Sequence, residues 1–212
     1  VTSSGKTAVY IELIKNVLAE GKQVLYLLPE IALTTQLMQR LGRVFGDKMG
    51  VYHSKFPDNE RVETWLRQLS SEPFPLILGV RSALLLPFQN LSLIIVDEEH
   101  EASYKQQDPA PRYHARDTAL VLAQRCCAKV LLGTATPAVE TYYNVQKGKF
   151  GLVELHQRFG DLQMPQILVE DVGELRRKKL MKTPFAPRLI DEMARAIERR
   201  EQVILFQNRR GY

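Results

Sequence analysis

The feature that most constrains the fold is a succession of short apolar runs separated by segments with helical periodicity. Four runs have the length and composition of buried strands: residues 23–29, 75–79, 91–97 and 128–134. Between them, residues 34–45, 58–69 and 115–126 carry apolar side chains at intervals of three and four. Runs that are apolar throughout are typical of parallel strands that are covered on both faces. The pattern therefore predicts an α/β protein with a parallel sheet and helices on both of its faces.

The spacing inside two of the helical segments also predicts which side chains face the core. Residues 34–45, with Thr34 as a candidate N-cap, are expected to bury Leu37, Met38, Leu41, Val44 and Phe45. Residues 58–69, with Asp58 as a candidate cap, are expected to bury Val62, Trp65, Leu66 and Leu69.

Composition excludes several classes of protein. The 212 residues can bury a sizeable core, and no apolar run reaches the roughly 18 residues that a membrane-spanning helix needs. Cys126 and Cys127 are the only cysteines and are adjacent, so they build neither a disulfide framework nor a four-ligand zinc site. We therefore expect a cytoplasmic protein with no membrane contact and no zinc site within this chain. The net charge of +5 mildly favours a polyanionic partner.

The character of the sequence changes after about residue 148. Residues 151–172 contain two short strand-like runs separated by polar residues, and residues 184–200 form an amphipathic helical pattern. A further strand is predicted at residues 202–208. We place a domain boundary near residue 149.

The opening residues, VTSSGKT, lead into a stretch with Val9, Leu13, Ile14, Val17 and Leu18 at helical spacing, which ends at Gly21. Gly5, Lys6 and Thr7 are thus predicted at a helix N-terminus, where unpaired N–H groups and the helix dipole favour an anion. Gly5 allows close approach of a phosphate, and Lys6 can reach the terminal phosphates of a nucleotide. The Thr7 hydroxyl can bind magnesium.

The complete phosphate-loop signature is G-x-x-x-x-G-K-[ST]. Its first Gly and the strand that feeds it would both precede Val1, so we expect the chain to be a piece of a longer protein. Ser3 and Ser4 would then belong to the same ATP-binding loop as Gly5. Taken alone, the SGKT sequence is a weak signal, because a helix start with a capping serine has the same appearance.

Three adjacent carboxylates, Asp97, Glu98 and Glu99, follow the apolar run that ends at Val96. In an open parallel sheet, ligands bind beyond the carboxyl ends of the strands, where a phosphate loop also emerges. Asp97 can bind Mg²⁺, and Glu98 can orient and deprotonate an attacking water. Lys6, Asp97 and Glu98 are therefore the predicted catalytic residues, and this hypothesis requires Lys6 and Asp97 to face one cleft. The alternative is an acidic loop that only caps the following helix.

Together, SGKT and DEEH resemble the motifs of superfamily 2 helicases. Longer segments narrow the resemblance to the primosomal replication-restart helicases: LLPEIALTTQL (27–37), GVRSALLLPFQNLSLIIVDEEHEASYKQQ (79–107), RYHARDTA (112–119), GTATPAVE (133–140) and ILFQNRRGY (204–212). The resemblance covers nearly the whole chain. It implies a RecA-like phosphate-loop NTPase fold, with a first helicase lobe over residues 1–148. Residues 149–212 would hold a linker and the N-terminal part of a second lobe.

The resemblance also assigns roles to residues that match the family's motifs. The residues that couple hydrolysis to DNA movement would be His100, Thr134 and Thr136. Segment 103–117 occupies the place of the family's aromatic-rich loop, in which aromatic rings stack on unpaired bases and cations contact the backbone. The DNA-binding residues would be Arg81, Ser82, Tyr104, Lys105, Arg112, Tyr113 and His114, with a weaker case for His53 and Ser54. The alternative for the segment is an ordinary polar surface loop.

The resemblance implies an ATP-dependent 3′→5′ DNA helicase that restarts stalled replication forks through primosome assembly. Its cofactors would be ATP and Mg²⁺, and its partners single-stranded and forked DNA, primosome proteins and single-strand-binding protein. It would work in the bacterial cytoplasm, associated with the nucleoid. Two alternatives stay open: a DNA-independent phosphate-loop ATPase, and a non-catalytic interaction module with a degenerate nucleotide site.

The sequence departs from the family pattern in the phosphate loop and in the aromatic-rich loop. Ser3 stands where the family usually carries Gly, and Pro111 lies near a position where some members have Trp. The family's zinc-binding cysteines and the catalytic arginine of the second lobe are expected downstream of Tyr212. The isolated chain is therefore expected to hydrolyse ATP negligibly.

Overall fold

The computed structural model describes residues 5–29, 35–54, 56–156 and 165–206. The chain divides into two compact units, Val1–Leu162 and Gln163–Tyr212. This division lies later than the boundary expected near residue 149, because residues 149–156 stay with the first unit. Phe150 and Leu152 line a cavity of about 600 Å³ together with Val130 and Leu132. Whether the two units correspond to helicase lobes stays a prediction.

The first unit is built on a parallel five-stranded sheet with the strand order β2-β3-β1-β4-β5. The strands are β1 (Gln23–Leu27), β2 (Met49–Tyr52), β3 (Leu76–Gly79), β4 (Leu91–Asp97) and β5 (Lys129–Gly133). All four predicted apolar runs are strands, and β2 is added at the outer edge. The parallel sheet of the predicted α/β fold is thereby confirmed.

The helices connect the strands in the order that the sequence predicts. They are α1 (Lys6–Ala19), α2 (Thr35–Phe45), α3 (Asp58–Leu69), α4 (Ala115–Cys126) and α5 (Val139–Gln146), with short 3₁₀ turns η1 (Gly46–Lys48), η2 (Arg81–Leu85) and η3 (Ala102–Tyr104). The candidate cap Thr34 lies outside the described residues. Asp58 is the first residue of α3, and the N-cap position belongs to Pro57, so the prediction of Asp58 as a cap was wrong.

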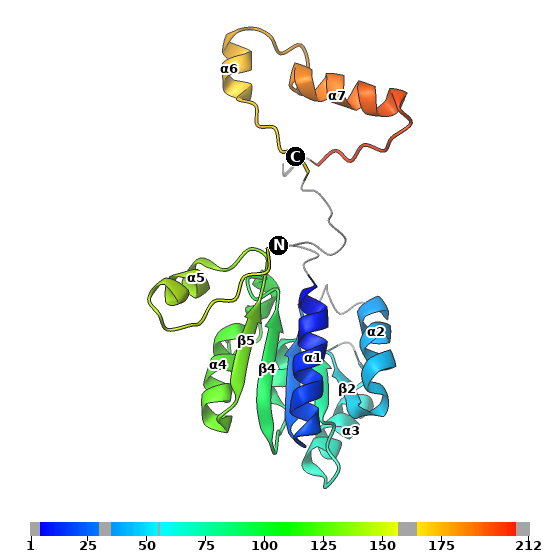
Figure 1. The fold of residues 1–212 in the computed structure, drawn as a ribbon, viewed down its shortest axis with the longest axis vertical. Coiled ribbons are helices and arrows are strands. Elements are labelled where there is room, and N and C mark those ends of the chain that lie inside the picture. The colour runs from blue at the N-terminus through cyan, green and yellow to red at the C-terminus, as the bar shows by residue number, and fades with distance from the viewer. Residues whose placement is uncertain (1–4, 30–34, 55, 157–164, 207–212) are drawn as a thin grey trace. The chain divides into compact units, whose positions relative to one another are not determined.

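The two faces of the sheet bury two separate apolar layers. On β1, Leu25 and Leu27 belong to the layer that packs against α4, whereas Val24 and Tyr26 belong to the layer beneath α1 and α2. This alternation follows from the period of two in a strand. Figure 1 shows α1 lying lengthwise along the sheet, between β4 and α2. The expectation of helices on both faces is confirmed.

Helical spacing predicted the apolar faces less well than it predicted the helices. In α3 the four side chains expected in the core are all exposed: Val62, Trp65, Leu66 and Leu69. Gln68 is buried instead, because it reaches Gln23 at the start of β1, with 3.5 Å between the Gln23 Nε2 and Gln68 Oε1 atoms. Val44 of α2 is also exposed, as are Val9 and Leu13, which lie at helical spacing in α1.

The second unit contains α6 (Val172–Arg177) and α7 (Pro187–Glu198), and α7 lies within the helical pattern expected at 184–200. The strand expected at residues 202–208 is not formed over 202–206, and residues 207 and 208 lie outside the described part. The strand-like runs within 151–172 are likewise not strands where the structure describes them. Among the described residues, none of the helices has the length and apolarity needed to cross a membrane.

Candidate active site

The site begins where the chain enters α1. Gly5 precedes the helix in the left-handed region, with φ 85° and ψ 14°, a conformation that favours glycine. Its carbonyl oxygen accepts a hydrogen bond from the Ala8 amide at 2.9 Å, which starts the helix at Lys6. The free N–H groups of the first turn are thus set at one end of α1, as the SGKT pattern predicts. Thr7 lies in this turn and is partly buried. Ser3 and Ser4 lie outside the described residues.

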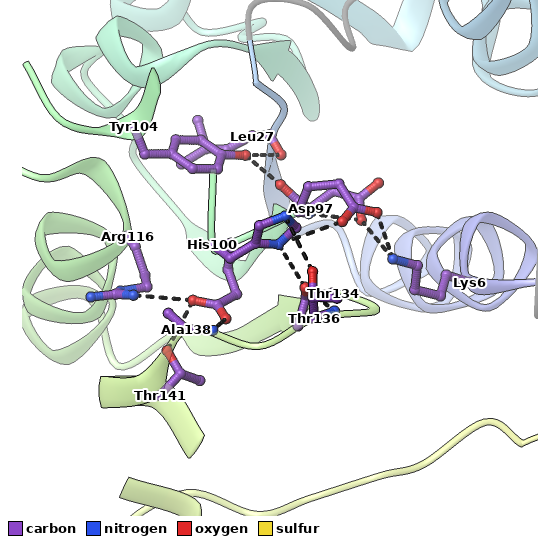
Figure 2. Close-up of polar contacts among 12 residues, drawn as sticks. Lys6, Leu27, Asp97, His100, Tyr104, Arg116, Thr134, Thr136, Ala138 and Thr141 are labelled. Carbon is purple, nitrogen blue, oxygen red and sulfur yellow. Dashed lines mark hydrogen bonds and ion pairs between the residues drawn. The ribbon is translucent and has the colours of Figure 1, made fainter. Parts of the chain in front are cut away.

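The lysine of α1 and the carboxylates after β4 meet at one edge of the sheet. The Lys6 Nζ atom lies 2.7 Å from Glu98 Oε1 and 3.8 Å from Asp97 Oδ1 (Figure 2). Residues 92 positions apart in the chain therefore come together, and Lys6 and Asp97 lie on the same side of the sheet's strand ends, as the hypothesis requires.

Two tyrosine hydroxyls donate hydrogen bonds to the Asp97 carboxylate. Tyr10 of α1 donates to Oδ1 at 3.2 Å, and Tyr26 of β1 donates to Oδ2 at 3.3 Å. Burial raises the pKa of both hydroxyls, and the charge of Asp97 adds to the rise, so both remain donors. Burial also raises the pKa of the Asp97 carboxyl, with the Lys6 cation opposing this rise. Neither tyrosine was identified from the sequence. The available signal was a buried aromatic residue in α1 and another in β1.

Gly133 at the end of β5 leaves the space that Tyr10 occupies. A Cβ atom at this position would lie 1.7 Å from the Tyr10 hydroxyl oxygen, far inside contact distance. The same Cβ atom would lie 3.3 Å from Asp97 Oδ1. The glycine is therefore required by the close approach of the Tyr10 side chain to β5 beside the carboxylate.

The acidic loop turns sharply at its second carboxylate. Glu98 has φ 47°, a left-handed conformation that is strained for a residue with a Cβ atom. The turn is closed by the Glu101 amide, which donates to the Glu98 carbonyl oxygen at 2.9 Å. As a result the Glu98 side chain, 35% exposed, points to Lys6 rather than into the core.

The three residues predicted to couple hydrolysis to movement form one cluster. His100 Nδ1 lies 2.8 Å from Thr134 Oγ1, and its Nε2 lies 3.4 Å from Thr136 Oγ1 (Figure 2). The Thr136 amide donates to Thr134 Oγ1 at 3.0 Å. His100 Nδ1 is also 3.7 Å from Glu98 Oε2, so the cluster adjoins the acidic pair. The structure brings these residues together, and their coupling role stays a prediction.

The third carboxylate, Glu99, has a different environment that sequence reasoning missed. Its side chain is 0% exposed and accepts hydrogen bonds from the Ala138 amide, the Thr141 hydroxyl and the Arg116 guanidinium. Arg116 is itself 8% exposed. A third acidic residue after DE was visible in the sequence, but nothing in it indicated that this carboxylate faces inward.

The prediction that Tyr104 stacks on DNA bases was wrong for this structure. The Tyr104 side chain is 1% exposed, and its hydroxyl lies 2.6 Å from the Asp97 carbonyl oxygen and 3.1 Å from the Leu27 carbonyl oxygen. The ring belongs to the apolar layer beneath α4. Tyr104 thus joins the ends of β1 and β4 and presents no ring face to a ligand.

The other predicted DNA-binding residues of the first unit lie in η2, in segment 105–114 and directly after β2. Arg81 and Tyr113 are joined, since the Tyr113 hydroxyl donates to the Arg81 carbonyl oxygen at 3.3 Å, and Arg81 Nη1 donates to the Ser103 carbonyl oxygen at 2.8 Å. Ser82 Oγ is buried without a hydrogen-bond partner within the described part of the chain. His53, the weaker candidate, is buried at the end of β2, whereas Ser54 is exposed.

Segment 105–114 forms a closed loop beside this group. A bridge between Lys105 and His114 closes it, and the Gln106 amide donates to the Tyr113 carbonyl oxygen at 2.9 Å. Lys105 Nζ donates to the Arg112 carbonyl oxygen at 3.0 Å, while the Arg112 side chain is exposed. Burial lowers the pKa of the His114 imidazole, so it favours the neutral form.

The family model of the DEAD/DEAH box helicases matches residues 1–145, which include the phosphate loop, the acidic loop and the Thr134–Thr136 cluster. The chain belongs to the DEAD/DEAH box helicase family. Its first unit is therefore a RecA-like helicase domain, and the parallel sheet with Lys6 and Asp97 at one edge agrees with this membership.

Individual relatives of this DEAD/DEAH box helicase align over the whole chain. It is 41% identical to the replication restart protein PriA of Bacillus subtilis, 43% identical to that of Haemophilus influenzae and 41% identical to that of Chlamydia pneumoniae. The alignment covers 26% of the first protein and 28% of each of the other two. The chain is thus homologous to PriA and spans between a quarter and a third of the length of these relatives.

Proposed function

We propose that the protein carrying this chain is an ATP-dependent 3′→5′ DNA helicase that restarts stalled replication forks. The observation that carries the ATPase part is the meeting of Lys6 with Asp97 and Glu98 at one edge of the sheet. The replication-restart part is supported by the identity of 41–43% to PriA proteins over all 212 residues.

In this proposal the N-terminus of α1 binds the phosphates of ATP. The first-turn N–H groups and the helix dipole attract the anion, and Lys6 contacts the terminal phosphates. Ser3 and Ser4, which lie outside the described residues, are proposed to belong to the same ATP-binding loop. The ammonium group of Lys6 has three donors, so its contact with Glu98 leaves others for phosphate oxygens.

Thr7 and Asp97 would hold Mg²⁺, which neutralises developing charge on the phosphates when bound. The donor set fits this ion, because Mg²⁺ binds one or two carboxylates and takes its other ligands from phosphate and water. Asp97 Oδ1 already accepts hydrogen bonds from the Tyr10 hydroxyl and the Glu98 backbone amide. Among the described contacts, Oδ2 accepts only from the Tyr26 hydroxyl. One acceptor site on Oδ2 is thereby left for a metal or its water.

In this proposal Glu98 orients and deprotonates the attacking water. It is the more exposed member of the acidic pair and already lies against Lys6, next to the expected phosphate position. The neighbouring cluster of His100, Thr134 and Thr136 would report the state of this carboxylate to the rest of the protein. Positioning and charge neutralisation account for most of the catalysis of phosphoryl transfer, and these groups provide both.

Single-stranded and forked DNA would bind at the group of Arg81, Ser82 and segment 105–114. Arg112 is exposed for contact with the DNA backbone, and the half-buried Tyr113 is available at its margin. Lys105 and His114, which close the segment, add one cation and one imidazole. The primosome proteins and single-strand-binding protein are proposed as partners in a bacterial cytoplasm, on the strength of the PriA relatives.

The test is ATP hydrolysis by the full-length protein, with and without single-stranded DNA, together with unwinding of forks. We expect hydrolysis to be strongly stimulated by DNA, with loading on a 3′ overhang preferred to a 5′ overhang. Hydrolysis that DNA does not change would favour a DNA-independent ATPase. Absence of nucleotide binding in calorimetry with a non-hydrolysable ATP analogue would favour a non-catalytic interaction module.

A further inference from the structure

Glu99 is a buried carboxylate that the proposed mechanism leaves without a role. It follows Asp97 and Glu98 directly, yet its side chain is 0% exposed and binds Arg116 and Thr141 rather than Lys6. An ionised carboxylate is costly to bury unless it is paired and hydrogen-bonded. A chain that only needed to fill this space would be served by an apolar side chain.

The carboxylate is satisfied by three donors, two from the start of α5 and one from α4. The Ala138 amide donates to Oε1 at 2.8 Å, and the Thr141 hydroxyl and Arg116 Nη1 donate to Oε2 at 2.9 and 3.2 Å. In addition, the Glu99 amide donates to the Gly133 carbonyl oxygen at 3.1 Å. Figure 2 shows Arg116 and Thr141 on one side of this junction and Lys6 on the other.

Each of these partners connects to a part of the proposed motor. Ala138 and Thr141 belong to the start of α5, directly after the Thr134–Thr136 cluster, and Gly133 ends β5 directly before it. Arg116 lies in the first turn of α4, two residues after the closed segment 105–114. Glu99 therefore contacts the elements on both sides of the coupling cluster and the helix that begins where the DNA-binding segment ends.

We propose that Glu99 is a positioning residue, which links segment 105–114, through Arg116, to the turn that places Glu98. The inference rests on the proposed function and deepens it by naming the connection between the two sites. Glu98 is held in a left-handed conformation, which persists only where its surroundings enforce it. Glu99 is the adjacent anchor of that turn. A shift of α4 when the segment meets DNA moves Arg116 and, through Glu99, the acidic loop.

The decisive substitution is Glu99→Gln in the full-length protein. It keeps the shape of the side chain but replaces one acceptor oxygen by an NH₂ donor, so either Ala138 or the Thr141–Arg116 pair loses its partner. We expect the kcat of ATP hydrolysis at saturating single-stranded DNA to fall about 3- to 30-fold relative to the DNA-free kcat. The KM for ATP should change by less than about twofold, since the phosphate loop is untouched.

Matched variants separate this role from a contribution to folding. Glu63→Gln makes the same chemical change at an exposed position on α3 and should leave the ratio of DNA-saturated to DNA-free kcat unchanged. Thr141→Val removes one donor to Glu99 without changing charge and should lower the ratio of DNA-saturated to DNA-free kcat. Thr141→Ser keeps the hydroxyl and should keep the wild-type ratio. A purely structural role would lower both kcat values by the same factor. If Glu99→Gln fails to fold, the Thr141 pair still decides.

The outcomes for the inference and for the proposed function are distinct. An unchanged ratio in both Glu99→Gln and Thr141→Val, in a wild-type protein that DNA does stimulate, overturns the role of Glu99 and leaves the helicase proposal intact. A wild-type protein that DNA does not stimulate overturns the helicase proposal, and the inference falls with it. A lowered ratio in both variants, with recovery in Thr141→Ser, supports the positioning role.

Discussion

The acidic loop and segment 105–114 are almost adjacent in the chain, but they are held in opposite ways. Residues 97–100 are bound by side chains of α1, β1, α4 and the loop after β5. Segment 105–114 is bound mainly to itself, through the Lys105–His114 bridge and the Gln106 contacts with Pro109 and Pro111. A region with few external contacts changes shape at lower cost than one with many. The difference indicates a preorganised acidic loop beside a more adaptable segment 105–114.

The largest effect is expected from Glu98→Gln, which tests the preorganised acidic loop. The variant of the full-length protein should bind ATP within about twofold of wild type and lose about 10³-fold in kcat, because an amide cannot accept a proton from water. Calorimetry and steady-state kinetics measure the two quantities. Glu101→Gln, in the same loop, serves as the control and should retain kcat. A loss of ATP affinity equal to the loss of kcat would show that Glu98 is structural.

The adaptable side of the comparison is tested by the double substitution of Arg112→Ala with Tyr113→Ala. Base stacking on one aromatic ring contributes about 1–3 kcal/mol, so the Kd for single-stranded DNA should rise about 5- to 100-fold. Loss of the Arg112 cation should also reduce the salt dependence, by about 0.7 in the slope of log Kd against log salt. Fluorescence anisotropy at several salt concentrations measures both. Unchanged affinity together with unchanged stimulation of hydrolysis would remove segment 105–114 from the DNA site.

A third substitution, Gly133→Ala, tests how tightly the acidic loop is surrounded. The new Cβ would collide with the Tyr10 hydroxyl, so overpacking should lower the free energy of unfolding by about 2 kcal/mol. The thermal midpoint of unfolding measures this. Adding Tyr10→Phe removes the hydroxyl and should recover part of the loss. If the double variant is no more stable than Gly133→Ala alone, then the collision is not the cause.

The smallest effect is expected from Tyr104→Phe, which distinguishes a core tyrosine from a stacking one. The change removes a hydroxyl bound to the Asp97 and Leu27 carbonyl oxygens and should cost about 1 kcal/mol of unfolding free energy. Urea unfolding measures the cost, with Tyr113→Phe as a control whose half-exposed hydroxyl should matter less. A larger loss for Tyr113→Phe than for Tyr104→Phe would contradict the placement of Tyr104 in the core.

The strands of the first unit could be predicted because their signal is local. A parallel strand covered on both faces must be apolar along most of its length, and β1, β3 and β4 show this in sequence, while the edge strand β5 shows it only over residues 130–132. The same reasoning predicted that Asp97 and Lys6 both lie at the edge of the sheet where the strands have their carboxyl ends. Strand length and order of residues were enough here, since ends of parallel strands share one edge.

Burial of individual side chains could not be predicted in the same way, because it depends on partners far away in the chain. Trp65 looked like a core residue and is exposed, whereas Gln68 is buried against residues of β1 and the β3–β4 connection. Tyr104 and Tyr113 lie in the same aromatic, basic segment, yet Tyr104 is fully buried and Tyr113 only partly. Glu99 gave no local sign of its inward direction, since its three donors lie 17, 39 and 42 positions later.

The contact between Tyr10 and Gly133 has a mechanical consequence for the nucleotide pocket. Because Gly133 has no side chain, the Tyr10 side chain of the first helix packs directly against the backbone of the fifth strand, and its hydroxyl donates to Asp97 at the same point. Because Asp97 ends β4, this hydrogen bond ties the helix to β4, while the tyrosine ring packs against the end of β5. A displacement of the end of β5, which leads into Thr134 and Thr136, would therefore move the Tyr10 side chain of α1, the helix that begins at Lys6.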